Sequence, residues 1–341
     1  MSLQTGNKIK VTRELVDFIG KNYIDQNDNQ VYFSNNYNGI EFSFKGTMLM
    51  ASIKSTGISD QYQPFIKVYL DNKEPYDIRI TELSSSVIIA DGLEDKKHFC
   101  RILKRSEANC NALSITELET SVGGVFFEKQ GKKLKRKIEV LGDSIICGFG
   151  NIYNEGDPLD SITLYEDGTQ VYGAMIAESF GADIRSTALS GVGVARNAGD
   201  QKGSGGALGI FVAEDMRGSE KNDFSYKPDI LIISLGTNDE SAEKDEMKEA
   251  VKRLLKTARD GYPDTYIIWS YGLMSHIQDE AISEAINELV LAGDDRLYYF
   301  LHDTYKESEG GAGLYGHPKV ATHKRAAAEL SEFISDITGW K

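Results

Sequence analysis

Four short polar or glycine-rich motifs in the second half of the chain could together carry out nucleophilic ester chemistry. They are Gly142-Asp143-Ser144, Ser190-Gly191-Val192-Gly193, Gly236-Thr237-Asn238-Asp239 and Gly316-His317-Pro318. A serine hydroxyl is a poor nucleophile unless a base removes its proton, and imidazole titrates in the right range for that task. We therefore expect Ser144 to be the nucleophile and His317 to be its base.

The same motifs contain donors that could stabilise a negatively charged intermediate. Attack on an ester carbonyl creates an oxyanion, which must meet hydrogen-bond donors that are already in place. The backbone N–H groups of Ser144 and Gly191 and the side-chain amide of Asn238 could supply three of them. Simpler roles stay open, because serine is common as a helix N-cap and Asn238 could cap the helix expected near Ser241.

The elements that must position these motifs alternate between strand and helix. Apolar runs predict strands at 137–141, 182–189, 229–235, 265–271 and 297–301. Helices are expected between them, at 242–259 and 279–291, with a last helix starting at Pro318. This alternation favours a parallel sheet covered by helices on both faces, in which ligands bind at the carboxyl ends of the strands. Three motifs follow directly after such strands, and the fourth precedes the last helix.

The first part of the chain has a different period. Alternating apolar and polar residues predict strands at 38–45, 63–71, 75–80, 87–93, 99–103 and 121–129. Short strands separated by turn residues are typical of a β-sandwich or jelly roll. A helix at 11–20 is expected to precede them. The basic run at 131–137 marks the change of pattern, so we predict a β-rich domain at 1–130 and an α/β domain at 131–341.

The motifs GDS, SG, GTND and HP resemble those of SGNH/GDSL hydrolases over roughly residues 136–341. A β-rich domain ahead of them resembles carbohydrate esterase family 2, whose members join a jelly roll to an SGNH domain and deacetylate xylan or related sugars. The resemblance implies that Ser144 is the nucleophile, that Gly191 and Asn238 complete the oxyanion hole and that His317 is the base. It implies removal of O-acetyl groups from plant cell-wall carbohydrate through an acyl-serine intermediate. The alternatives are a lipase or thioesterase for longer acyl groups and a carbohydrate-binding protein without catalysis.

One position departs from the pattern of that superfamily. Many SGNH enzymes carry an aspartate three residues before the histidine, and Leu314 stands there in this chain. The group that orients His317 is expected to be a backbone carbonyl, which leaves a Ser–His dyad, or Asp303 after the last strand. His323 is a competing base, but it lies inside the last predicted helix, where a packed histidine is the usual case.

Two aromatic residues are candidates for substrate binding. Tyr315 is close to the histidine and Trp269 is close to a strand end, and aromatic faces pack well against sugar rings. Core packing is the alternative for Trp269. The long glycine-containing segment 194–227 could shape the acyl or sugar pocket, since long loops over a site are often functional.

Composition narrows the possible partners. The chain has 341 residues, and 38 basic against 52 acidic residues give a net charge of −14. Such a chain repels nucleic acid and anionic membranes, whereas a neutral carbohydrate is not penalised. No apolar run approaches the roughly 18 residues that a transmembrane helix needs.

The remaining expectations concern cofactors, cysteines and compartment. No metal-ligand or nucleotide-binding pattern is present, so neither a metal nor a cofactor is implied. Cys100, Cys110 and Cys147 are expected to be free buried thiols, with a Cys100–Cys110 bridge as the alternative. The N-terminal residues lack a basic segment followed by an apolar stretch, so we expect no signal peptide among them. We therefore expect a cytoplasmic protein, or a secreted one if a leader preceded these residues.

Overall fold

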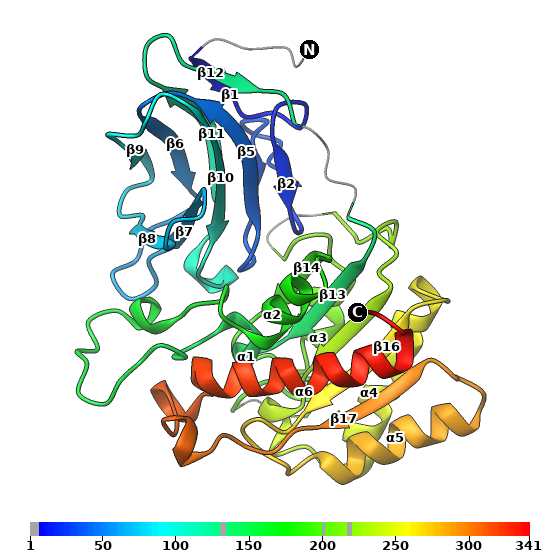
Figure 1. Ribbon diagram of the computed structural model, residues 1–341. Coiled ribbons are helices and arrows are strands. Elements are labelled where there is room, and N and C mark those ends of the chain that lie inside the picture. Colours follow the sequence, from blue (N-terminus) through cyan, green and yellow to red (C-terminus); the bar gives the residue numbers. More distant parts are fainter. Residues whose placement is uncertain (1–6, 130–133, 200–201, 217–219) are drawn as a thin grey trace.

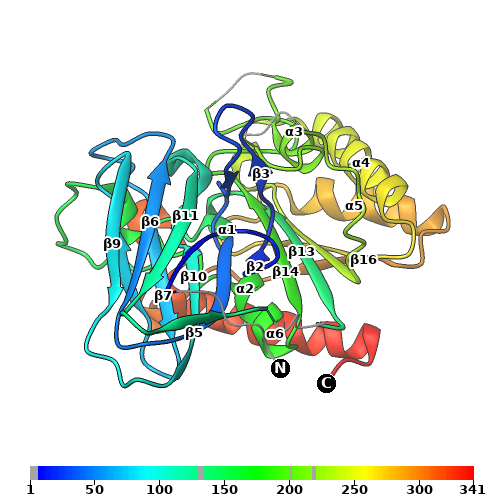
Figure 2. The same cartoon turned by 90° about the horizontal axis from the view of Figure 1, so that it is seen from above.

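A computed structural model describes residues 7–129, 134–199, 202–216 and 220–341. The chain forms a β-rich part, followed by an α/β part built on a parallel sheet (Figure 1). The two parts pack side by side, as the view turned by 90° also shows (Figure 2). This arrangement confirms the predicted fold class, in which a β-sandwich precedes an α/β hydrolase domain.

Two antiparallel sheets form the β-rich part. The first has the strand order β1 (Lys8–Lys10), β11 (Leu113–Thr120), β6 (Leu49–Ser55), β9 (Ser84–Ala90). The second has the order β12 (Val125–Phe127), β5 (Gly39–Lys45), β10 (Lys97–Lys104), β7 (Phe65–Leu70), β8 (Tyr76–Arg79), and β2 (Asp17–Ile19) also pairs with β5. A small hairpin joins β3 (Tyr23–Ile24) to β4 (Val31–Tyr32). Apolar side chains from both large sheets share one core, as in a β-sandwich.

The prediction of a helix at 11–20 is wrong. This segment forms a turn followed by β2, in which Phe18 pairs with Ile40 of β5. Val16 is fully buried in the core of the sandwich, so tertiary packing overrides the local helical pattern. Strands β6 and β11 were not predicted, although the burial of β6 alternates residue by residue.

The α/β part has a five-stranded parallel sheet at its centre. Its order is β14 (Asp183–Ala188), β13 (Lys137–Gly142), β15 (Ile230–Ser234), β16 (Tyr266–Tyr271), β17 (Leu297–Leu301). All five strands overlap the predicted ranges. Every residue of β15 is buried, because helices cover both faces of the sheet.

Each face of the sheet has its own hydrophobic core. One face packs against α3 (Ala207–Phe211), α4 (Lys244–Gly261) and α5 (Asp279–Leu291). The other packs against α1 (Ser144–Cys147), α2 (Tyr172–Ser179) and α6 (Val320–Thr338), the long helix coloured red in Figure 1. Short 3₁₀ turns are η1 (Ala108–Cys110), η2 (Ile162–Tyr165), η3 (Thr237–Asp239), η4 (Glu307–Glu309) and η5 (Leu314–Gly316).

Polar contacts join the two parts. The buried Lys67 ammonium lies 2.8 Å from the buried Asp167 carboxylate, and the Tyr37 hydroxyl donates to Glu178 over 2.9 Å. The predicted domain boundary at residue 130 falls among residues 130–133, which lie outside the described residues, as does part of the basic run 131–137. The division into 1–130 and 131–341 stays a prediction.

The three cysteines are free and buried, which confirms the expected thiols and excludes the Cys100–Cys110 bridge. Burial raises the pKa of the Cys100 thiol well above its usual value. Within the described ranges, none of the helices is long and apolar enough to span a bilayer.

Candidate active site

Ser144 is placed by a sharp turn between β13 and α1. Strand β13 ends at Gly142, and Ser144 is the first residue of α1. The Asp143 carboxylate caps this helix by accepting a hydrogen bond from the backbone N–H of Ile145 over 2.9 Å. A β-carbon on Gly142 would lie 2.3 Å from Cγ1 of Ile146, so the turn requires glycine. The nucleophile therefore sits on a tightly constrained backbone.

His317 is placed by a loop that docks onto the segment after α1. The backbone N–H of Leu314 donates to the Gly150 carbonyl over 3.2 Å, and the backbone N–H of Val320 donates to the Asn151 carbonyl over 3.2 Å. The loop itself is closed by a hydrogen bond from Gly313 N–H to the His317 carbonyl of 2.7 Å. The start of α6 and the end of the nucleophile's turn are thereby fixed to each other.

The two predicted catalytic side chains come together. The Nε2 atom of His317 lies 2.8 Å from Oγ of Ser144, which is hydrogen-bonding distance for proton transfer. Ser144 is 5% exposed. Desolvation lowers the pKa of His317 from its usual value of 6.5, partly opposed by hydrogen bonds with the backbone of Leu314 and Tyr315. The imidazole is therefore neutral near pH 7, the state that a general base requires.

A backbone carbonyl, and not Asp303, orients the imidazole. The Nδ1 atom of His317 lies 2.9 Å from the Leu314 carbonyl oxygen, which can accept its proton and fix the tautomer with Nε2 facing Ser144. The Asp303 carboxylate is 73% exposed and pairs with Lys306 over 3.0 Å. The structure thus does not bring Asp303 to His317, and the geometry is that of a dyad.

The predicted oxyanion donors occupy adjacent strand ends. Gly142 pairs with Ala188 of β14 and with Ser234 of β15, so the residues that follow these three strands share one edge of the sheet. Gly191 has a φ of +80°, a left-handed conformation that favours glycine. Throughout the described part of the chain, the backbone N–H groups of Ser144 and Gly191 have no hydrogen-bond acceptor. Both are available to a ligand.

Asn238 is held in place by its own amide. Its Nδ2 donates to the Val192 carbonyl over 2.8 Å and lies 3.4 Å from Oδ2 of Asp143. The next residue, Asp239, accepts hydrogen bonds from the backbone N–H groups of Val194, Ala195 and Arg196. The segment after β14 is therefore tied to the segment after β15. Asn238 lies within reach of the nucleophile's turn and does not act as the N-cap of α4, which is Glu243.

Asp143 is a buried carboxyl beside the nucleophile. Burial raises its pKa to about 7, and the nearby charge of Asp239 adds to this while the hydrogen bond from Ile145 opposes it. Its contacts with Ile145 and Asn238 connect the nucleophile's turn with the third motif.

Of the two aromatic candidates, only Tyr315 lies beside the site. Tyr315 is 68% exposed and its ring stacks on that of Phe149, with centroids 6.3 Å apart. Phe149 in turn lies 4.7 Å from the His317 ring. Sequence reasoning missed Phe149, which follows α1 and carries no motif. Trp269 is 0% exposed, and its indole N–H donates to the Leu235 carbonyl inside the core, so the structure places it in the packing role that was the alternative to substrate binding.

The other histidines near the sheet are structural. His323 is fully buried in α6, where its Nδ1 accepts the Tyr172 backbone N–H over 3.3 Å, and burial lowers its pKa to about 3. His302 contacts the Ser270 hydroxyl over 2.9 Å, but both side chains are buried and unreachable by substrate. Among the residues described, no group of three or more His, Cys, Asp or Glu side chains could hold a metal ion.

The segment 194–227 begins at the site and then packs into the core. The Ala198 N–H donates to the Gly191 carbonyl over 2.8 Å, whereas Phe211 of α3 is fully buried. Residues 200–201 and 217–219, on which part of this prediction falls, lie outside the described residues. That the segment shapes the acyl or sugar pocket stays a proposal.

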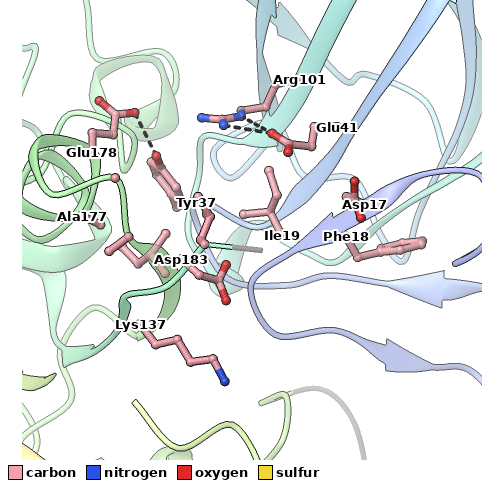
Figure 3. Close-up of a pocket in the computed structure, with 14 residues that line it drawn as sticks. Asp17, Phe18, Ile19, Tyr37, Glu41, Arg101, Lys137, Ala177, Glu178 and Asp183 are labelled. Atoms are coloured by element: carbon pink, nitrogen blue, oxygen red, sulfur yellow. Dashed lines mark hydrogen bonds and ion pairs between the residues drawn. The ribbon is translucent and has the colours of Figure 1, made fainter. Parts of the chain in front are cut away.

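A cavity of about 660 Å³ lies elsewhere, between the two parts (Figure 3). Lys137 and Asp183, which begin β13 and β14, line it at the amino ends of these strands. Two pairs of its lining residues already interact: Arg101 with Glu41 on neighbouring strands of the β-rich part, over 2.9 Å, and Tyr37 with Glu178 of α2, over 2.9 Å. Ser144 lies at the opposite, carboxyl ends of the strands.

Two known families match the chain. Residues 24–128 match the family model for the carbohydrate esterase 2 N-terminal domain, and residues 138–330 match that for GDSL-like lipase/acylhydrolase. The chain belongs to the GDSL-like lipase/acylhydrolase family. This confirms the predicted superfamily and the expected class of enzyme, a carboxylic ester hydrolase. The first match confirms the resemblance to carbohydrate esterase family 2.

Individual relatives agree with the two-domain architecture. The cellulase/esterase CelE of Acetivibrio thermocellus is 29% identical over 88% of the chain, which spans only 37% of that protein. An acetylxylan esterase / glucomannan deacetylase of Cellvibrio japonicus is 22% identical over 88% of the chain and 86% of its own length. A family two carbohydrate esterase from Clostridium thermocellum, solved with cellohexaose, is 26% identical with a TM-score of 0.85, covering 96% of this chain and 100% of that one.

Proposed function

We propose that this GDSL-family chain is a serine esterase that removes O-acetyl groups from plant cell-wall carbohydrate, such as acetylated xylan or related oligosaccharides. The observation that carries the proposal is the 2.8 Å contact between His317 Nε2 and Ser144 Oγ, next to an N-terminal domain of the carbohydrate esterase 2 type. The relative named acetylxylan esterase / glucomannan deacetylase supports this choice of substrate class.

The reaction proceeds through an acyl-serine intermediate. His317 Nε2 takes the proton of Ser144 while Oγ attacks the acetyl carbon, and the carbonyl oxygen becomes an oxyanion. The N–H groups of Ser144 and Gly191 and the Asn238 amide stabilise it. The sugar alkoxide leaves with the proton from His317. Water, deprotonated by the same imidazole, then attacks the acetyl-enzyme; the bond from the acetyl carbon to Oγ breaks, Oγ takes the proton back from His317 and acetate is released.

The surroundings of Ser144 favour a short acyl group on a sugar. Ser144 is a 5% exposed residue, and a buried nucleophile admits a small acyl group more readily than a long chain. The exposed Tyr315 ring beside Phe149 gives a sugar ring an apolar face on which to pack, next to the base. The net charge of −14 does not oppose an uncharged polysaccharide.

The proposal is tested by two substrate series. Rates on p-nitrophenyl esters of increasing acyl length, from acetate to octanoate, measure chain-length preference. Acetate release from acetylated xylan and acetylated glucomannan measures action on polymers. The proposal expects rates that fall steeply beyond three or four carbons together with release from a polymer. A rate that rises with chain length would assign the chain to longer acyl esters, and polysaccharide binding without turnover would make it a binding protein.

A further inference from the structure

A carboxylate from the β-rich part reaches the loop that carries the second predicted oxyanion donor. Glu107 lies between β10 and η1 and is buried. Its Oε2 accepts a hydrogen bond from the backbone N–H of Ser190 over 2.8 Å. Ser190 directly precedes Gly191, so Glu107 holds the residue next to a donor that must point at the substrate. We refer to Ser190–Gly193 as the oxyanion loop.

The other backbone groups around Gly191 are held from within the α/β part. The Gly191 carbonyl accepts from Ala198 over 2.8 Å, and the Val192 N–H donates to Leu189 over 3.2 Å. The Val192 carbonyl accepts from the Asn238 amide. At Ser190 the backbone N–H is instead held by Glu107. Through this N–H the loop is hydrogen-bonded to the β-rich part of the molecule.

The same carboxylate oxygen also contacts the nucleophile's helix. Sγ of Cys147 lies 3.5 Å from Glu107 Oε2, at the end of the short helix that Ser144 begins. Burial, and then the charge of Glu107, raise the pKa of the Cys147 thiol well above its usual value, so the thiol keeps its proton and can donate. One carboxylate thus joins the helix of the nucleophile and the loop of the oxyanion donor.

Glu107 is itself held firmly. Its backbone N–H donates to the Glu166 carboxyl, and its carbonyl accepts from the fully buried Lys104 ammonium over 2.6 Å. Burial, and then the charge of Glu107, raise the pKa of Glu166 well above its usual range. A side chain whose backbone is bound on both sides can position a partner with little freedom.

We propose that Glu107 is a positioning residue for ester hydrolysis: its carboxylate holds the Ser190 N–H and thereby aims the Gly191 N–H at the oxyanion. The inference rests on the proposed esterase function. It makes the β-rich part a contributor to transition-state stabilisation, through one oxygen atom, in addition to any part it has in binding carbohydrate.

Three substitutions separate the position of this oxygen from its charge. Glu107→Gln keeps an acceptor oxygen at the same reach, whereas Glu107→Asp keeps the charge but withdraws the oxygen from Ser190. Glu107→Ala removes both. Tyr37→Phe is the control, because it deletes another hydrogen bond between the parts, from a buried tyrosine to Glu178, at the amino ends of the strands. Ser144→Ala provides the background rate.

The measurements are kcat and KM on p-nitrophenyl acetate and the inhibition constant of phenylboronic acid, whose tetrahedral serine adduct places an oxygen in the oxyanion hole. Glu107→Ala and Glu107→Asp should lower kcat by about 10- to 100-fold with KM within about twofold, because the donor acts mainly in the transition state. The inhibition constant should rise in proportion. Glu107→Gln should stay within about fivefold of wild type, and Tyr37→Phe within about twofold.

Each outcome decides the proposal, provided that rates are compared where thermal unfolding shows each variant folded. If Glu107→Ala does not fold, the contrast between the Asp and Gln variants gives the answer. An Asp variant as active as the Gln variant, or a lowered kcat with unchanged boronic acid inhibition, would overturn the proposal. If wild type is no faster than Ser144→Ala, the esterase function has failed and the inference falls with it. If wild type is active and the Glu107 variants keep its kcat, only the inference about Glu107 is overturned.

Discussion

The Nε2 atom of His317 lies 2.8 Å from Oγ of Ser144, although 173 positions separate the two residues in the chain. The contact depends on the local backbone structure at each residue. A glycine-requiring turn after β13 presents the serine, and a loop bound to Gly150 presents the histidine. Because the backbone fixes both the turn and the loop, Ser144 and His317 are in place before any substrate binds, as catalysis by preorganised groups requires.

Removing the Asn238 amide should slow turnover much more than it weakens the fold. Asn238→Ala is expected to lower kcat by about 10² to 10³, because a donor used mainly in the transition state is lost. Asn222→Ala is the control, since it deletes a buried amide that donates to the Phe211 carbonyl over 3.3 Å and lies outside the four motifs. Steady-state kinetics and thermal unfolding of both variants check this. A change below fivefold in Asn238→Ala would leave it a structural residue.

The dyad geometry predicts that Asp303 can be replaced without loss. Asp303→Ala should keep kcat/KM within about twofold, because the carboxylate is exposed and pairs with Lys306, while the Leu314 carbonyl orients His317. Kinetics on p-nitrophenyl acetate decide the matter. A loss of 10² or more would restore Asp303 as the third catalytic member.

The pH dependence should follow the lowered pKa of His317. The base works in its neutral form, and desolvation lets that form persist below the usual pKa of 6.5. The acid limb of kcat/KM should therefore have its midpoint below pH 6.5, with a plateau above it. Asp143→Asn is the control, because burial raises the pKa of Asp143 to about 7. A wild-type midpoint near 7 that disappears in this variant would assign the limb to Asp143 instead.

Tyr315 should matter for polymers and not for small esters. Tyr315→Ala removes the exposed ring that stacks on Phe149, and it should raise KM on acetylated xylan about three- to tenfold, the range expected for one aromatic contact. Hydrolysis of p-nitrophenyl acetate by the same variant serves as the internal control and should change by less than twofold. Equal losses on both substrates would mean that Tyr315 supports the histidine loop instead of binding sugar.

The α/β sheet could be predicted from the sequence because its strands are buried on both faces. Runs such as Ile230–Ser234 are almost wholly apolar and bounded by polar residues, which is the pattern of a strand buried on both faces. The motifs at their ends then gave the candidate site. The β-rich part was harder: the helix predicted at 11–20 is β2 and turn, since pairing of Phe18 with Ile40 outweighs local preference.

The supporting groups of the site could not be predicted from any motif. The Leu314 carbonyl carries no side-chain signal, and any backbone oxygen could have taken its place at Nδ1. The Phe149 ring lies 4.7 Å from the His317 ring, and Glu107 Oε2 lies 2.8 Å from the Ser190 nitrogen. In both pairs the partners are far apart in the chain, so no local pattern announces the contact. Proximity to a strand end also does not show which side chains are exposed, and Trp269, near such an end, is fully buried.

The most direct test of the central claim is acetate release from acetylated xylan by wild type, Ser144→Ala and His317→Ala, measured side by side with thermal unfolding. The account predicts that wild type releases acetate and that each variant, still folded, retains less than about 1% of that rate, since the nucleophile and its base act as one unit. Comparable acetate release by wild type and a folded Ser144→Ala variant would contradict it.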